Sequence, residues 1–218
     1  VARYFKMTLP ADIQNIFLDT LSGDKTILEF EQWLYADKQL QTFINSDDYL
    51  DLISFGYKSD NANYSLFRLL EKHIDIGELE TRRIYRLLTM ALNRDKELPE
   101  ILMTFYDLYC KGYNFFDNLG LGYGLAIEVP RVENTTADAW DELTIEQQRN
   151  LLDSFYPDLE TEIKKVISWL DNGKVILTGV KDKYNHFEYI DKRTEIDKQP
   201  TGYKVATIDN QKPWWKLW

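Results

Sequence analysis

Apolar residues recur at helical spacing along most of the chain, and this periodicity is the strongest constraint on its fold. The clearest case is the segment 78–93, where Ile84, Leu87, Leu88 and Ala91 follow an i, i+3, i+4, i+7 pattern. Further helices are predicted at 9–21, 47–55 and 158–171, and after the start signals Thr26, Asn61 or Asn63, Pro99 and Thr144. We therefore predict a mainly helical, bundle-like body over residues 9–171.

The pattern changes after residue 173. The segments 174–180, 185–190 and 203–208 are short and rich in β-branched and aromatic residues, with turn residues between them. They predict a small C-terminal antiparallel β-meander. We expect residues 1–130 to form a helical core, and residues 131–218 to add an acidic helical segment and the meander, packed as one domain with that core.

Three glycines at positions 120, 122 and 124 invite comparison with nucleotide-binding loops. Their spacing is G-x-G-x-G, whereas the dinucleotide fingerprint is G-x-G-x-x-G within a strand–helix–strand unit. No such unit surrounds them. The segment 113–130 instead predicts a loop with a bend, a short strand or a helical turn, and glycines that allow close backbone packing. We expect no cofactor.

Residues with nucleophilic or metal-binding chemistry are few. The chain has one cysteine, Cys110, and two histidines, His73 and His186, of which His73 lies on an apolar helical stripe. Neither zinc-ligand spacing nor a calcium-loop pattern occurs. We therefore predict a protein without catalytic residues or a metal site. An enzyme built on carboxylates stays open as an alternative, because Asp and Glu are abundant.

Charge is distributed unevenly along the chain. The net charge is −10 overall; residues 173–218 carry nine basic and six acidic residues, and the other 172 carry 17 basic and 30 acidic ones. An acidic body disfavours binding to nucleic acid, whose phosphates attract basic surfaces. It favours a basic protein partner by speeding their encounter. The alternative is that the charge only keeps the protein in solution.

Other features indicate a cytoplasmic protein. A single cysteine cannot form an internal disulfide, which favours a reducing compartment. The first ten residues lack the apolar run of a secretory signal, and no segment has the ~20 apolar residues that a membrane span needs. We expect no contact with a membrane.

The most acidic stretch also carries aromatic residues. Residues 131–172 contain ten acidic and four basic side chains, with Trp140, Phe155, Tyr156 and Trp169 between them. Aromatic anchors within a charged rim are typical of protein interfaces. The predicted partner-binding residues are Trp140, Asp141, Glu142, Glu146, Asp153, Tyr156, Asp158 and Glu162. The alternative is a solvated helical face with aromatic residues in the core.

Three stretches carry a family resemblance. They are FEQWLY at 30–35, YLDLISFGYKS at 49–59 and FYDLYCKGYNFFDNLGLGYGLAI at 105–127. They resemble bacterial immunity proteins of polymorphic and contact-dependent toxin systems. The resemblance implies a cytoplasmic protein that binds a cognate toxin domain and blocks it without chemistry of its own. An acidic protein of this kind suits a basic toxin such as a nuclease.

A third possibility concerns the last residues, KPWWKLW at 212–218. Three tryptophans near a chain end are expected to dock against the body of the protein or a partner. If they face a partner, the chain is an intracellular adaptor or assembly subunit.

Overall fold

The computed structural model describes residues 9–131 and 137–199. Within these ranges it has nine α-helices and a small two-stranded antiparallel sheet, which confirms the predicted mainly helical fold.

The chain divides into two compact units. Among the described residues, unit 1 comprises 9–84 and 177–180, and unit 2 comprises 85–131, 137–176 and 181–199. The division falls inside helix α5 (Ile76–Leu92). Residues on both sides of residue 130 share one core in unit 2: the rings of Tyr123 and Phe155 pack edge to face, with centroids 5.2 Å apart.

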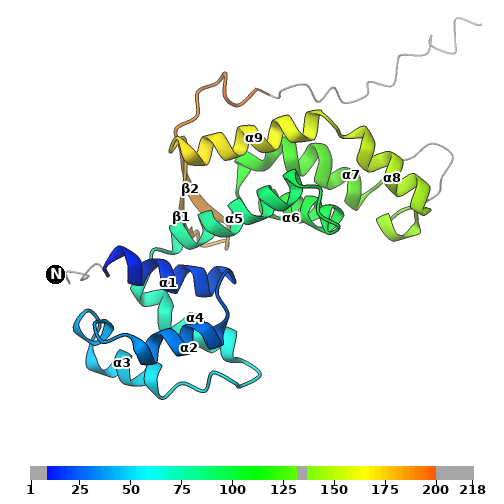
Figure 1. Cartoon of the computed structure of the whole chain (residues 1–218). Coiled ribbons are helices and arrows are strands. Elements are labelled where there is room, and N and C mark those ends of the chain that lie inside the picture. The colour runs from blue at the N-terminus through cyan, green and yellow to red at the C-terminus, as the bar shows by residue number, and fades with distance from the viewer. Residues whose placement is uncertain (1–8, 132–136, 200–218) are drawn as a thin grey trace, which may run out of the picture. The chain divides into compact units, whose positions relative to one another are not determined.

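Unit 1 is a small helical bundle (Figure 1). Its helices are α1 (Ala11–Ser22), α2 (Ile27–Ala36), α3 (Ser46–Ile53), α4 (Ala62–Leu70) and the first part of α5, with short 3₁₀ turns η1 (Leu40–Thr42) and η2 (Glu71–His73). Phe17 and Phe30 are fully buried at its centre, and their rings meet edge to face with centroids 5.7 Å apart. The apolar stripes of the sequence therefore form the core, as expected.

Two helix starts in unit 1 show how the sequence sets the boundaries. The capping box predicted at Thr26 is present: its hydroxyl accepts a hydrogen bond from the Glu29 amide, and the Glu29 carboxylate accepts one from the Thr26 amide. Helix α3 is capped by Asn45, whose side-chain oxygen accepts from the Asp48 amide at 2.8 Å. The helix therefore begins at Ser46, one residue before the predicted range 47–55.

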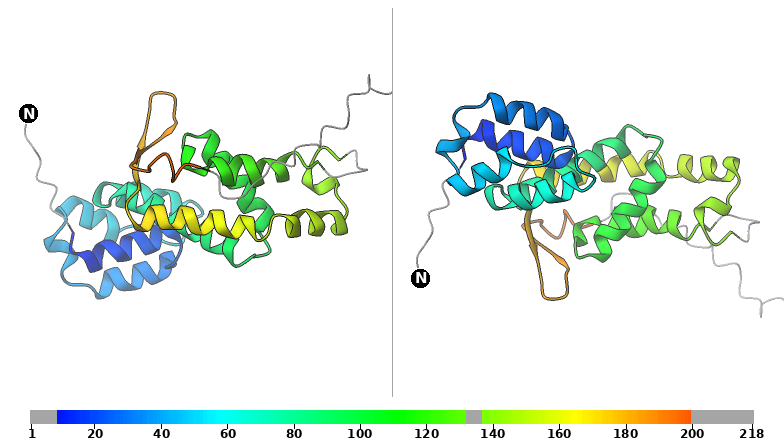
Figure 2. Two further views of the ribbon diagram at one scale, coloured as in Figure 1. Left: turned by 90° about the horizontal axis from the view of Figure 1, so that it is seen from above. Right: turned by 90° about the horizontal axis from the view of Figure 1, so that it is seen from below.

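Unit 2 contains most of the remaining helices. They are α6 (Leu98–Cys110), the 3₁₀ turn η3 (Asn114–Phe116), the π-helical segment η4 (Asn118–Gly124), α7 (Leu125–Glu128), the 3₁₀ turn η5 (Trp140–Glu142), α8 (Ile145–Ser154) and α9 (Asp158–Asp171). Figure 2 shows α8 continuing the line of α9 at one end of this unit. None of the residues of α8 is buried, so this helix contributes little to the core.

The glycine segment is helical, whereas we expected mainly a loop and a bend. Its π-helix η4 runs directly into α7 and packs on α6. A Cβ atom at Gly124 would lie 2.3 Å from the carbonyl oxygen of Leu102, and one at Gly120 would lie 3.0 Å from that of Phe105. The glycines therefore allow close backbone packing, as predicted, and the expectation of a loop was wrong.

The C-terminal sheet is a hairpin of β1 (Val175–Lys181) and β2 (Phe187–Asp191). In its turn, the Asp182 carboxylate accepts hydrogen bonds from the backbone amides of Tyr184 and His186, both at 2.8 Å. Asn185 adopts a positive φ of 68°, which Asn tolerates better than most residues. The third strand that we predicted, at 203–208, lies outside the described residues.

Candidate protein-binding surface

Acidic residues are densest in unit 2, from residue 137 to residue 163. This stretch includes η5, α8 and the start of α9, and it contains a single basic residue, Arg149. Its acidic residues are Asp138, Asp141, Glu142, Glu146, Asp153, Asp158, Glu160 and Glu162. We call the exposed carboxylates of Asp141, Glu142, Glu146, Asp153 and Asp158 the acidic surface.

Local hydrogen bonds fix the N-terminal part of this surface. The Thr144 hydroxyl accepts from the Gln147 amide at 3.2 Å, and the Gln147 side chain accepts from the Thr144 amide at 2.9 Å, which completes a second capping box. The Gln148 side chain donates to the carbonyl oxygen of Trp140, and the Asp138 amide donates to Glu142. The turn η5 is therefore tied to α8.

The periodicity of α8 places two of the carboxylates on one side of the helix. Glu146 and Asp153 are seven residues apart, which is about two turns, or roughly 10 Å along the axis. Glu146 in α8 and Asp158 in α9 also lie in the first turns of their helices, where the helix dipole stabilises a negative charge.

The carboxylates of the acidic surface are not neutralised by any other described residue. Among the described residues, none of the five forms an ion pair, and Arg149 is not paired with them. Asp19 and Glu78 of unit 1 differ from these five residues, because both pair with Arg82. The acidic surface therefore has a net negative charge that a basic partner would compensate.

Glu162 does not belong to this surface, although the sequence suggested it. It is only 1% exposed; the Asn118 side chain donates to its carboxylate at 3.3 Å, and the Lys165 ammonium lies 3.8 Å away. The physical reason is its place on α9, three residues after Leu159 and four before Val166, inside the apolar stripe. Its prediction as an accessible contact was wrong.

The aromatic residues of the segment contribute less to the surface than expected. Tyr156 is half-buried: the Arg94 guanidinium lies 3.4 Å from its ring centroid, and its hydroxyl donates to the Ala91 carbonyl oxygen at 3.4 Å. Phe155 and Trp169 are buried in the core. Trp140 is half-buried in η5. Unlike the ring of Tyr156, the ring of Trp140 has no described stacking or cation–π partner, so Trp140 remains a candidate for contact with a partner protein.

One exposed apolar residue of this region was missed from the sequence. Ile145 is the first residue of α8 and is 77% exposed. No periodic signal marks it as exposed, because α8 has no buried residue and its pattern therefore reveals no buried face.

A separate cluster of charged groups lies in unit 1. Asp48 is only 7% exposed; its carboxylate accepts from the Lys72 ammonium and from the Asn45 side chain, and it lies 2.9 Å from His73 Nε2. Burial acts to raise the pKa of Asp48, but the Lys72 hydrogen bond and the charges of His73 and Lys72 outweigh it and lower the pKa. The cluster joins α3 to η2, and His73 is paired with Asp48 within it.

The thiol and the second histidine also have local partners. Cys110 is exposed at the end of α6, and its hydrogen bond with Tyr106 raises the pKa of that tyrosine. His186 is exposed, and its Nδ1 lies 3.4 Å from the Asp182 carboxylate. In the described part of the chain, each histidine is therefore paired with an aspartate.

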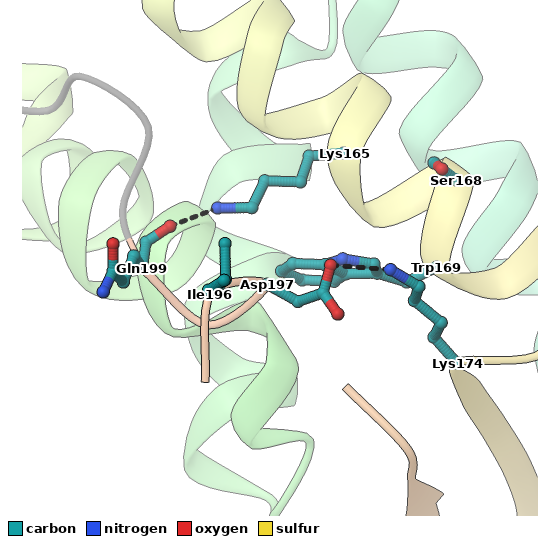
Figure 3. A pocket seen from close by; sticks show the side chains of 7 residues that line it. All are labelled: Lys165, Ser168, Trp169, Lys174, Ile196, Asp197 and Gln199. Atoms are coloured by element: carbon teal, nitrogen blue, oxygen red, sulfur yellow. Dashed lines mark hydrogen bonds and ion pairs between the residues drawn. The ribbon is translucent and has the colours of Figure 1, made fainter. Parts of the chain in front are cut away.

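A shallow pocket of about 380 Å³ lies beside α9 in unit 2 (Figure 3). It is lined by Lys165, Ser168, Trp169, Lys174, Ile196, Asp197 and Gln199. Its lysines already have partners: Lys174 pairs with Asp197 at 2.7 Å and lowers the pKa of that carboxyl to about 2, and Lys165 donates to the Gln199 carbonyl oxygen. The pocket thus presents little unpaired charge to a ligand.

Two kinds of feature are absent from the described residues. No group of three or more His, Cys, Asp or Glu side chains there is arranged to hold a metal ion. No helix there is both long and apolar enough to cross a membrane. The predicted tryptophan interface at 212–218 lies outside the described residues.

Comparison with known proteins found no relative. No protein-family model matches the chain, and no match was found among curated proteins or among solved structures.

Proposed function

We propose that this chain is an immunity protein that binds a cognate bacterial toxin domain in the cytoplasm and blocks its active site with the acidic surface. The observation that carries the proposal is the set of five exposed carboxylates without an ion pair on η5, α8 and α9. The proposal that the partner is a toxin domain comes from a resemblance to immunity proteins, which is carried by the stretches 30–35, 49–59 and 105–127.

The physical argument concerns how the complex would form and persist. Opposite net charges raise the association rate, because the attraction acts before contact. A carboxylate that becomes buried on binding needs a cationic partner, since an unpaired buried charge is costly. A nuclease toxin offers such cations, because its substrate groove must attract phosphates. The acidic surface would then occupy the groove in place of nucleic acid.

The proposal predicts that a gene adjacent to that of this chain encodes the toxin. The toxic domain of that protein, which we call the neighbouring toxin domain, is the decisive probe. Co-expression with this chain should restore growth to cells that make the toxin domain, and the two purified proteins should form a stable complex in size-exclusion chromatography with light scattering. Persistent toxicity, together with no complex at micromolar concentrations, would contradict the proposal.

Stoichiometry separates an inhibitor from an enzyme that modifies the toxin. As an inhibitor, this chain should reduce toxin activity in proportion to its amount, and the activity should vanish near equimolar addition. Loss of toxin activity at a small fraction of the equimolar amount would favour the alternative, an enzyme with a carboxylate-based site.

A further inference from the structure

The most exposed apolar side chain in the region of the acidic surface is that of Ile145. Ile145 is 77% exposed although it begins a regular helix, and it does not pack in the core of unit 2. The buried apolar residue at this helix start is Leu143, the residue before the cap. Isolated exposed apolar residues are common, so exposure alone decides nothing here.

The immediate surroundings distinguish Ile145 from other exposed apolar residues. Three carboxylates of the acidic surface, Asp141, Glu142 and Glu146, lie within four residues of it in the sequence, and none has an ion pair among the described residues. Ile196, which is 80% exposed in the same unit, differs in this respect. Its neighbours Glu195 and Asp197 pair with Lys198 and Lys174 at 2.9 and 2.7 Å.

The backbone at Ile145 is also held in place before any partner arrives. The capping box of Thr144 and Gln147 fixes the first turn of α8, and the Gln148 side chain holds the preceding turn through the Trp140 carbonyl. A side chain on an ordered backbone loses less conformational entropy when it binds, so its apolar contact contributes more to affinity.

We propose that Ile145 is the apolar anchor of the acidic surface. It inserts into an apolar pocket of the partner, and the rim of that pocket carries Lys or Arg side chains. This inference rests on the proposed function. The basic rim follows from charge complementarity with Asp141, Glu142 and Glu146. A central apolar anchor surrounded by charged contacts that exclude water is a recurrent arrangement in tight protein complexes.

The anchor and the carboxylates should differ in their kinetic effects. Charged groups at a rim act mainly on the association rate and its salt dependence, whereas a buried anchor acts mainly on the dissociation rate. Ile145→Ala should therefore raise the dissociation rate of the complex with the neighbouring toxin domain by about tenfold or more, with little change in the association rate. Ile196→Ala is the matched control and should bind as the parent chain does.

A second variant separates binding from folding. Ile145→Glu places another carboxylate in the first turn of α8, where the helix dipole favours it, so the melting temperature should stay at or above that of the parent. Its dissociation rate should nevertheless rise at least as much as that of Ile145→Ala. This combination of retained stability and faster dissociation is the expected result, measured by surface plasmon resonance and thermal denaturation.

Two results would overturn the inference, and they are distinguishable. If the parent binds the toxin domain and both Ile145 variants dissociate as slowly as it does, Ile145 is not the anchor, while the proposed function stands. If the parent does not bind the toxin domain at all, the proposed function fails and the anchor fails with it.

Discussion

A Cβ atom at Gly124 would lie 2.3 Å from the carbonyl oxygen of Leu102. This distance is far below any van der Waals contact, and the obstacle is backbone, which cannot move aside as a flexible side chain can. The π-helix η4 and helix α6 therefore approach each other closely because a glycine occupies position 124. The residue at this position helps to set the packing of unit 2.

Gly124→Ala should accordingly destabilise the protein. We expect the free energy of unfolding to fall by about 1–3 kcal/mol, which is the usual cost of inserting a methyl group into a tightly packed site. Urea denaturation followed by circular dichroism measures it. Gly56→Ala is the control, because a Cβ there would meet no atom within 4 Å. A Gly124→Ala variant as stable as the Gly56→Ala variant would contradict the packing argument.

The pKa of Asp48 predicts a pH dependence of stability. Because its pKa is lower in the folded protein than in the unfolded chain, Asp48 contributes stability above the unfolded-state pKa. That contribution is lost as the pH falls through the folded-state pKa. Asp48→Asn should cost about 1–3 kcal/mol at neutral pH, since the paired charge is lost, and should flatten the acid limb of the stability curve.

The control for this prediction is the adjacent residue Asp47, which is exposed in the first turn of α3. Asp47→Asn should leave the acid limb close to that of the parent. Urea denaturation between neutral pH and pH 3 compares the variants. Equal acid sensitivity of the Asp48→Asn variant and the parent would show that the cluster with Lys72 and His73 does not stabilise unit 1.

The two capping boxes allow a matched comparison of stability with binding. Thr26→Ala and Thr144→Ala each remove the hydroxyl that accepts from the third residue of a helix, and each should cost about 1 kcal/mol. Only Thr144 holds the helix that carries Ile145 and Glu146. Thr144→Ala should therefore weaken toxin binding in calorimetric titration, whereas Thr26→Ala should not. Equal affinities of the two variants would count against α8 as part of the interface.

A substitution at Glu162 should lower stability without weakening the binding of the toxin domain. Glu162→Gln alters a buried carboxylate beside Asn118 and Lys165, so it should reduce stability by about 1–3 kcal/mol. Its affinity for the toxin domain should equal that of the parent, because the side chain does not reach the surface. A weaker complex with unchanged stability would place Glu162 in the interface after all.

The helices could be predicted because their signals are local. The stripe at 78–93 and the cap signals at Thr26 and Thr144 depend on residues within one or two turns, and the structure contains α5, α2 and α8 there. The helical conformation of the glycine segment could not be predicted, because it depends on residues far away in the sequence. Glycines at 120, 122 and 124 disfavour a helix by intrinsic propensity, and only tertiary packing on α6 makes the helical conformation favourable.

The candidate site was predicted in part. The acidic character of the segment 137–163 follows from composition, but exposure depends on which side of each helix faces the core. Periodicity alone could have placed Glu162 inside, since it shares the stripe of Leu159 and Val166. Periodicity could not predict the exposure of Ile145. Helix α8 has no buried residue, so its sequence pattern does not distinguish a buried face from an exposed one.

The central claim is that the negative charge of the acidic surface speeds the capture of a basic toxin and thereby strengthens its binding. Its most direct test neutralises Asp141, Glu146, Asp153 and Asp158 together, as Asn, Gln, Asn and Asn. The matched control neutralises four exposed aspartates of unit 1 in the same way, Asp12, Asp47, Asp51 and Asp60, of which Asp12 and Asp47 also lie in first turns. Both variants change the net charge equally, so a general effect of charge would appear in both.

The measurement is the Kd for the neighbouring toxin domain as a function of salt concentration. We predict that the acidic-surface variant binds about tenfold or more weakly than the parent at low salt and depends less on salt, because charge complementarity is lost. The unit 1 variant should stay close to the parent in both respects. Equal weakening of the two variants, or a parent Kd that does not change with salt, would contradict the account.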